Sequence, residues 1–305
     1  MNIFKRHKTI EEMIPGFLLE RETQGNLKTS MSYHSHIYVF VEWLKSKQLA
    51  DLPMRRITSQ DVADFFLYLA KEKGLDKPTC EKYFLHNRLL FVYAQKREEI
   101  DIIPFDLAVL PRKGIDKSAE VIHPEHLKLM LPEIKRVDPQ LYLGCMIQYY
   151  CFIRPGRELR LLKVGDIDLI AGTITIRQEH AKNNTRQIVT MPNQLIELCL
   201  EYGIDTADKN LYIFGKKHKF GTKPICENTL RWNFNKVRDR LNMPTGYKFY
   251  SFKHTGASNL HLSGISMREL MDQLRHTKLD ATQHYLKKHC GIVNDRIRDN
   301  FPSPI

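Results

Sequence analysis

The chain has 305 residues, of which 42% are hydrophobic and 27% are charged, with 14 Pro and 15 Gly. This length and composition are typical of a globular protein of about two domains, and they exclude a disordered, collagen-like or low-complexity chain. Lys and Arg total 47 against 35 Asp and Glu, a formal net charge of +12. Such an excess of positive charge favours a polyanionic partner, above all nucleic acid.

The sequence predicts no membrane segment. Its longest nearly apolar stretch, residues 141–153, is too short to span a bilayer, and the first eight residues lack the apolar core of a signal peptide. We therefore expect a cytoplasmic protein, associated with the nucleoid if its partner is DNA. The six cysteines are scattered without a CxxC pair, so we expect buried free thiols rather than a zinc module or a disulfide framework.

Residues 10–99 predict consecutive amphipathic helices. Within Thr29–Lys47, apolar residues recur at spacings of three and four and so form one helical stripe. Thr58 and Asp61 predict a capping box at the start of the next helix, and Pro78 fits the first turn of a third. The periodicity stops between Ile103 and Ser118, where prolines, a glycine and basic residues predict a connector. We expect a helical N-terminal domain over residues 1–110 and a second domain over residues 118–305.

The second domain reads as mostly helical with one small sheet. A helix start is predicted at His123, and an apolar helix over residues 141–152. Residues 172–191 alternate around a polar turn at residues 182–185, which predicts an antiparallel β-hairpin. Further helices are expected over residues 193–202, 227–241, 251–263 and 266–274, with a final segment beyond Asp280. The predicted fold class is thus mainly α with a small antiparallel β-sheet.

No glycine-rich phosphate loop, zinc-ligand helix or nucleophile elbow is present. Instead, basic residues and one tyrosine follow a distinctive order through the second domain. The order is Cys151-Phe-Ile-Arg154-Pro-Gly-Arg157-Glu158-Leu159, Lys182, Tyr250-Ser-Phe-Lys253-His254-Thr255-Gly256, Leu274-Arg-His276 and Tyr285. In these residues the chain resembles the tyrosine recombinase (phage integrase) family, which includes Xer-like recombinases and integrases or invertases of mobile elements.

The resemblance implies a helical core-binding, SAM-like DNA-binding domain followed by a mixed α/β catalytic domain. It also implies a site-specific recombinase that cleaves and rejoins double-stranded DNA through a 3′-phosphotyrosyl intermediate. By the same resemblance the protein forms a homotetramer on two DNA sites, is a monomer when free, and needs no metal or nucleotide cofactor. The segment after Tyr285, residues 290–305, packs either on a neighbouring protomer or on its own domain.

The chemistry explains these residue types. Attack on a phosphodiester passes through a pentacoordinate phosphorus whose extra negative charge must be stabilised by fixed cations and hydrogen-bond donors. The resemblance assigns the bidentate phosphate clamp to Arg154, the general acid to Lys182, a phosphate hydrogen bond to His276 and the nucleophile to Tyr285. His254 is expected to be structural support rather than a direct participant.

Three departures from the family pattern stand out. The usual His-x-x-Arg is Tyr250-x-x-Lys253 here, so a histidine is replaced by a phenol that is a poor base at neutral pH, and an arginine by a lysine without the bidentate fork. The first box has one extra residue before Glu158, so either Arg154 or Arg157 is the first catalytic arginine, with Arg154 favoured.

Two alternative functions stay open at this point. A relaxing topoisomerase of the nicking and resealing type (type IB-like) would use the same chemistry as a monomer. A DNA-binding protein that kept the recombinase fold but is catalytically impaired would account for Tyr250 and Lys253. The target site, the need for accessory proteins, and the choice among integration, excision, inversion and dimer resolution are not encoded in any motif of the sequence.

Overall fold

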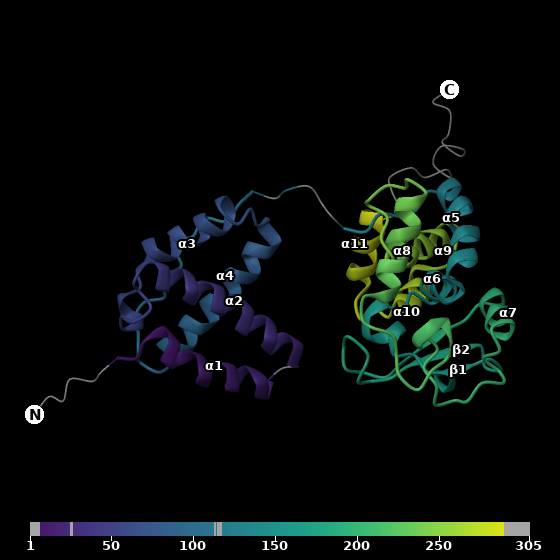
Figure 1. The fold of residues 1–305 in the computed structure, drawn as a ribbon, viewed down its shortest axis with the longest axis horizontal. Coiled ribbons are helices and arrows are strands. Elements are labelled where there is room, and N and C mark those ends of the chain that lie inside the picture. The colour runs from purple at the N-terminus through teal and green to yellow at the C-terminus, as the bar shows by residue number, and fades with distance from the viewer. Residues whose placement is uncertain (1–6, 25–26, 113, 115–117, 290–305) are drawn as a thin grey trace, which may run out of the picture. The chain divides into compact units, whose positions relative to one another are not determined.

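A computed structural model describes residues 7–24, 27–112, 114 and 118–289 of the chain. The chain divides into two compact units, Met1–Asp116 and Lys117–Ile305. Figure 1 shows the first unit as a group of helices and the second as a larger helical body that contains the sheet. No helix among the described residues has both the length and the apolar character needed to cross a membrane. The predicted packing of residues 290–305 lies outside the described residues.

The described part of the first unit contains the α-helices α1 (Ile10–Gln24), α2 (Leu27–Ser46), α3 (Ser59–Lys71) and α4 (Lys77–Gln95). Its core is rich in fully buried aromatic rings, among them Phe17, Phe40, Phe65 and Phe91. The predicted capping box starts α3, because the Thr58 N–H donates to Asp61 Oδ2 at 2.8 Å and the Asp61 N–H donates to Thr58 Oγ1 at 3.2 Å. Local capping and aromatic burial together define this unit.

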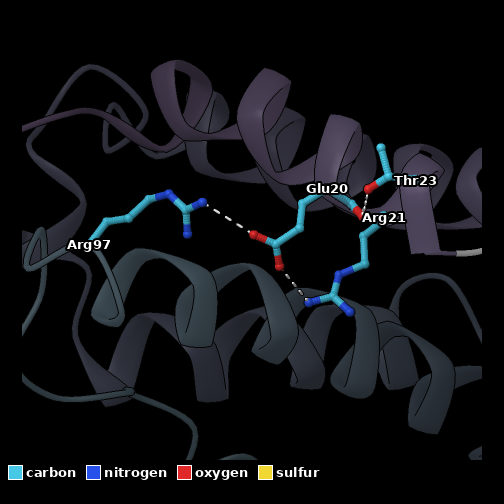
Figure 2. A network of polar contacts seen from close by, with 4 residues as sticks. All are labelled: Glu20, Arg21, Thr23 and Arg97. Atoms are coloured by element: carbon cyan, nitrogen blue, oxygen red, sulfur yellow. Dashed lines mark hydrogen bonds and ion pairs between the residues drawn. The ribbon is translucent and has the colours of Figure 1, made fainter.

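A polar network ties the end of α1 to the segment after α4 (Figure 2). Arg97 Nη2 lies 3.2 Å from Glu20 Oε2, and Arg21 Nη2 lies 3.4 Å from Glu20 Oε1. The hydroxyl of Thr23 donates to the Glu20 carbonyl at 2.8 Å. The guanidinium of Arg97 also lies over the Tyr93 ring, 3.5 Å from its centroid. The carboxylate of Glu20 thus partly neutralises the charges of Arg97 and Arg21.

The second unit surrounds one buried helix, α6 (Pro139–Cys151), whose apolar residues face all directions. The helices packed against α6 include α5 (Pro124–Val137), α7 (Asn193–Glu201), α8 (Thr229–Arg240) and α9 (Ser251–Leu262). A smaller cluster of Phe152, Ala257, Leu270, Leu274 and Leu286 joins α9 to α10 (Met267–Leu274) and α11 (Leu279–His289). This second cluster anchors the helix that carries Tyr285.

A three-stranded antiparallel sheet completes the second unit, in the order β1 (Ile167–Asp168), β2 (Thr173–Ile176), β3 (Gln187–Thr190). In the register of the predicted hairpin, Ile174 faces Val189, and both side chains are buried. Strand β1 was not predicted, because two residues are too few to show alternation. The expected fold class, mainly α with a small antiparallel sheet, is confirmed.

The cysteines follow the expectation with one exception. Cys80, Cys145, Cys151 and Cys199 are buried free thiols, whereas Cys226 is exposed. Cys290 lies outside the described residues.

Candidate active site

The site is assembled where α6 and α9 cross. A Cβ atom on Gly256 of α9 would collide with the carbonyl oxygen of Tyr149 on α6, so the two backbones touch at this position. Only glycine permits so close an approach. The crossing brings Arg154, just beyond the end of α6, to the first turn of α9, which carries Lys253 and His254.

A buried carboxylate holds two arginines. Glu158 Oε1 lies 2.6 Å from Arg154 Nη1, and Glu158 Oε2 lies 3.0 Å from Arg275 Nη2. The Glu158 side chain is only 2% exposed, and that of Arg154 is 25% exposed. Burial disfavours the Glu158 carboxylate, but Arg275 and Arg154 outweigh this and keep its pKa below the usual value. Glu158 therefore stays ionised and fixes both guanidinium groups.

Lys253 lies beside these arginines in the protein interior. Burial, reinforced by the charges of Arg154 and Arg275, holds the pKa of its ammonium well below the usual value. The charge of Lys182 acts in the same direction, so this exposed lysine of the β2–β3 turn is within electrostatic reach of the site. Among the described residues, Glu158 pairs with two arginines and is the one carboxylate that acts on Lys253, so this part of the site carries more positive than negative charge.

Tyr250 precedes α9 and is a neutral phenol at neutral pH. Its burial raises the pKa of the hydroxyl, and this outweighs the opposing charge of Arg154. A protonated phenol donates hydrogen bonds but does not act as a base. The Tyr250 ring packs against His254 with centroids 4.8 Å apart in an edge-to-face arrangement.

The hydroxyl of Tyr285 on α11 meets the imidazole of His254. His254 Nδ1 and Tyr285 Oη are 2.7 Å apart, and the hydroxyl donates to the Lys253 carbonyl oxygen at 3.4 Å. Its ring packs against the small cluster of α9, α10 and α11. Tyr285 is therefore held at its ring, and its hydroxyl meets an imidazole nitrogen that accepts a proton in one of its tautomers.

His276 lies next to the same tyrosine, with ring centroids 5.9 Å apart. Its burial, together with the charges of Lys253, Arg154 and Arg275, lowers the pKa of the imidazole to about 4. His276 is thus neutral at pH 7. Its Nδ1 is 2.9 Å from the hydroxyl of Thr282, a fully buried residue of α11.

The structure brings five of the six predicted site residues together: Arg154, Tyr250, Lys253, His276 and Tyr285. Lys182 reaches them only through its charge, from an exposed turn. Arg157, the alternative first arginine, is exposed and acts instead on His180.

Sequence reasoning missed three contributors. Arg275 and Thr282 received no role, and His254 was expected only as support. The order of the motif contained Arg275 directly before His276, but nothing in the sequence showed that its side chain turns back to Glu158. Among the described residues no cluster of three or more His, Cys, Asp or Glu side chains is suited to a metal ion.

Comparisons with known proteins cover both units. Residues 120–290 match the phage integrase family, and residues 12–112 match the phage integrase SAM-like domain. The tyrosine recombinase XerC of Halalkalibacterium halodurans is 22% identical over 300 residues, which are 95% of this chain and 96% of that protein.

Solved structures show the same fold. The Tn1549 transposon integrase in complex with circular intermediate DNA aligns with a TM-score of 0.73 at 17% identity, over 97% of this chain and 99% of that one. A lambda integrase tetramer bound to a Holliday junction aligns with a TM-score of 0.74 at 14% identity, over 95% of this chain and 80% of that one.

Proposed function

The chain belongs to the phage integrase family and is a tyrosine recombinase, and from this premise we propose that it cuts and rejoins double-stranded DNA through Tyr285. The observation that carries the proposal is the tyrosine hydroxyl 2.7 Å from an imidazole, beside a cluster of cations with one carboxylate. A nucleophile hydrogen-bonded to a base, next to a site that attracts a phosphate, is what strand cleavage requires.

In the proposed cleavage step, Tyr285 Oη attacks the scissile phosphorus and its proton passes to His254 Nδ1. The bond from phosphorus to the 5′ oxygen breaks, and that oxygen takes a proton from Lys182. The products are a 3′-phosphotyrosyl ester and a free 5′ hydroxyl. Attack by the 5′ hydroxyl of a second strand reverses these steps and rejoins the DNA, so the energy of the broken bond is retained without ATP.

Arg154 is the proposed clamp on the nonbridging oxygens, because its planar guanidinium matches phosphate geometry and stays charged. Glu158 fixes this guanidinium before DNA arrives, so little reorganisation is needed at the moment of reaction. Neutral His276 donates from Nε2 to the phosphate when the Thr282 hydroxyl donates to Nδ1. Tyr250 acts as a further hydrogen-bond donor and not as a base, in contrast to the histidine of the family pattern.

Residues 12–112 match a SAM-like domain of phage integrases, and we assign to this unit the DNA-binding role of the N-terminal domain. The integrases with the same fold are described in complex with DNA, one of them as a tetramer on a Holliday junction. A homotetramer on two DNA sites that is a monomer when free is the corresponding proposal for this chain.

Recombination is favoured over the two alternatives. The matched relative and structures are recombinases and integrases rather than topoisomerases. A catalytically impaired DNA-binding protein has no need for a tyrosine hydroxyl held 2.7 Å from an imidazole.

The test is trapping of a covalent adduct on a denaturing gel, with nicked duplexes tiled across the DNA flanking the gene. We expect an adduct with the unaltered protein and none with Tyr285→Phe, which keeps the ring and loses the nucleophile. Adducts that persist in Tyr285→Phe overturn the assignment of the nucleophile. Salt-sensitive duplex binding without any adduct supports the noncatalytic alternative.

A further inference from the structure

The site contains a second arginine, Arg275, which is buried and which the family pattern does not supply at that position. The pattern places this arginine three residues after the histidine, where the chain has Lys253. We propose that Arg275, at the end of α10, supplies the second guanidinium charge that stabilises the scissile phosphate in the transition state. This inference rests on the proposed function and adds one residue to its machinery.

The guanidinium of Arg275 is held from two sides. Its Nη2 donates to the Phe152 carbonyl oxygen at 2.9 Å and lies 3.0 Å from Glu158 Oε2. The same carboxylate holds Arg154 through its other oxygen, so Glu158 links the two arginines. With only 3% of its side chain exposed, Arg275 has no freedom to turn into solvent. Its charge is fixed next to the proposed phosphate clamp.

Two nitrogens of this guanidinium remain unsatisfied. Nε and Nη1 of Arg275 are buried and have no hydrogen-bond partner among the described residues. Buried donors nearly always have an acceptor, and their lack of one points to a missing group. The acceptor that the proposed reaction brings to this site is a phosphate oxygen, which also carries the negative charge that the cation cluster lacks.

The backbone of Arg275 supports a specific role as well. Its φ of 60° and ψ of 42° put it in the left-handed region at the end of α10, a position that glycine occupies most easily. Arginine there is conformationally unfavourable, and such residues concentrate at functional sites. This conformation directs the side chain back toward Phe152 and Glu158.

Lys253 is less suited than Arg275 to supply a permanent positive charge. Burial and the charges of Arg154 and Arg275 hold the pKa of its ammonium well below the usual value. Burial lowers the pKa of the Arg275 guanidinium too, but from a higher ordinary value than that of a lysine, and a guanidinium also offers a planar fork. The family pattern has its arginine at position 253 on α9. In this chain that position is a lysine, and Arg275 at the end of α10 supplies the guanidinium charge instead.

The experiment measures single-turnover adduct formation on a nicked duplex that the unaltered protein cleaves. We expect Arg275→Ala to slow the reaction about 10²- to 10³-fold while duplex binding is kept. Arg275→Lys restores part of the rate. Lys253→Arg accelerates the Arg275→Ala variant at least tenfold, because it returns the guanidinium to α9.

A methylphosphonate at the scissile position separates charge from structure. This group lacks one negative oxygen, so a residue that acts on that charge loses its importance. We expect the ratio of wild-type to Arg275→Ala rates to fall toward one on this duplex. Equal ratios on both duplexes, or an Arg275→Ala variant as fast as wild type, overturn the inference. If the wild-type protein itself forms no adduct, the result contradicts the proposed function and not the role of Arg275.

A second measurement does not depend on cleavage. Inorganic phosphate should raise the melting temperature of the DNA-free protein, because a ligand that binds only the folded state stabilises it. Arg275→Ala should lose most of this increase, whereas Arg157→Ala, which removes an exposed arginine three residues after Arg154, should retain it. Loss of the same size in both variants contradicts a specific role for Arg275.

Discussion

His254 Nδ1 lies 2.7 Å from the hydroxyl of Tyr285, and the two rings come from α9 and α11. The pairing places an imidazole nitrogen at the proposed nucleophile, in a chain that has Tyr250 where the family pattern has a histidine four residues earlier. Because the phenol of Tyr250 is neutral, we propose that the imidazole of His254, 2.7 Å from the Tyr285 hydroxyl, acts as the base.

His254→Ala should slow adduct formation about 10²- to 10⁴-fold, the usual contribution of a positioned general base. Free imidazole in the buffer should restore part of the rate by occupying the space left by the side chain. His261→Ala, on the same helix, is the control and should behave like wild type. A purely structural role for His254 would show as a lowered melting temperature without rescue by imidazole.

Lys182 can be tested by changing the leaving group. Lys182→Ala should slow cleavage of an ordinary duplex about 10²- to 10⁴-fold, because the 5′ oxygen then leaves unprotonated. With sulfur in place of that bridging oxygen, no proton is needed, and the variant should match wild type. Arg186→Ala, in the same connection between β2 and β3, is the control. Sulfur at the bridging position should not bring its rate closer to that of wild type. If Lys182→Ala stays slow on the sulfur-containing duplex, the general acid is another residue.

Thr282 is expected to act by positioning His276. In Thr282→Val the shape of the side chain is kept but the hydroxyl 2.9 Å from Nδ1 is lost. Loss of one such hydrogen bond costs about 1 kcal/mol, so cleavage should slow roughly 5- to 10-fold. Thr282→Ser keeps the hydroxyl and should retain the wild-type rate. Combining Thr282→Val with His276→Ala should add no further loss, since the two residues act through one group.

The lowered pKa of His276 predicts a pH-dependent stability. Between its ordinary pKa of 6.5 and its folded-state pKa of about 4, the unfolded chain binds a proton that the folded chain does not. The stability that this pKa shift contributes is therefore fully present above pH 6.5 and is lost as the pH falls toward 4. His36 of α2 has the same shift, from burial and the neighbouring His86, and adds a similar dependence in the first unit.

Thermal unfolding from pH 7 to pH 4 tests this expectation. The melting temperature of the second unit should fall less steeply in His276→Gln than in wild type, and His36→Gln should have the corresponding effect on the first unit. Identical slopes in wild type and His276→Gln would contradict the assignment of a neutral, half-buried imidazole.

The sequence predicted most of the helices and the hairpin because periodicity and caps are local signals. Thr58 with Asp61 and Pro78 mark helix starts through contacts within a few residues, and the structure has helices there. The pairing of Arg275 with Glu158 joins residues 117 positions apart in the chain, through a turn in the left-handed region, and no local pattern encodes it. The contact between His254 and Tyr285 was not predicted either, because the two residues lie 31 positions apart and His254 was expected only as structural support.

Gly256 gives a last prediction, about the crossing that assembles the site. In an exposed helix, replacing glycine by alanine adds about 1 kcal/mol of stability, because alanine is the better helix former. At Gly256 the sign should reverse, since the new Cβ collides with the Tyr149 carbonyl and α6 and α9 must move apart. Overpacking of this kind costs about 1–3 kcal/mol.

We expect Gly256→Ala to lower the melting temperature and to slow adduct formation, because Arg154 follows α6 while His254 belongs to α9. Leu262→Ala, at an exposed position of the same helix, should leave both quantities unchanged. If Gly256→Ala stabilises the protein instead, the close approach of α6 and α9 does not hold the site together.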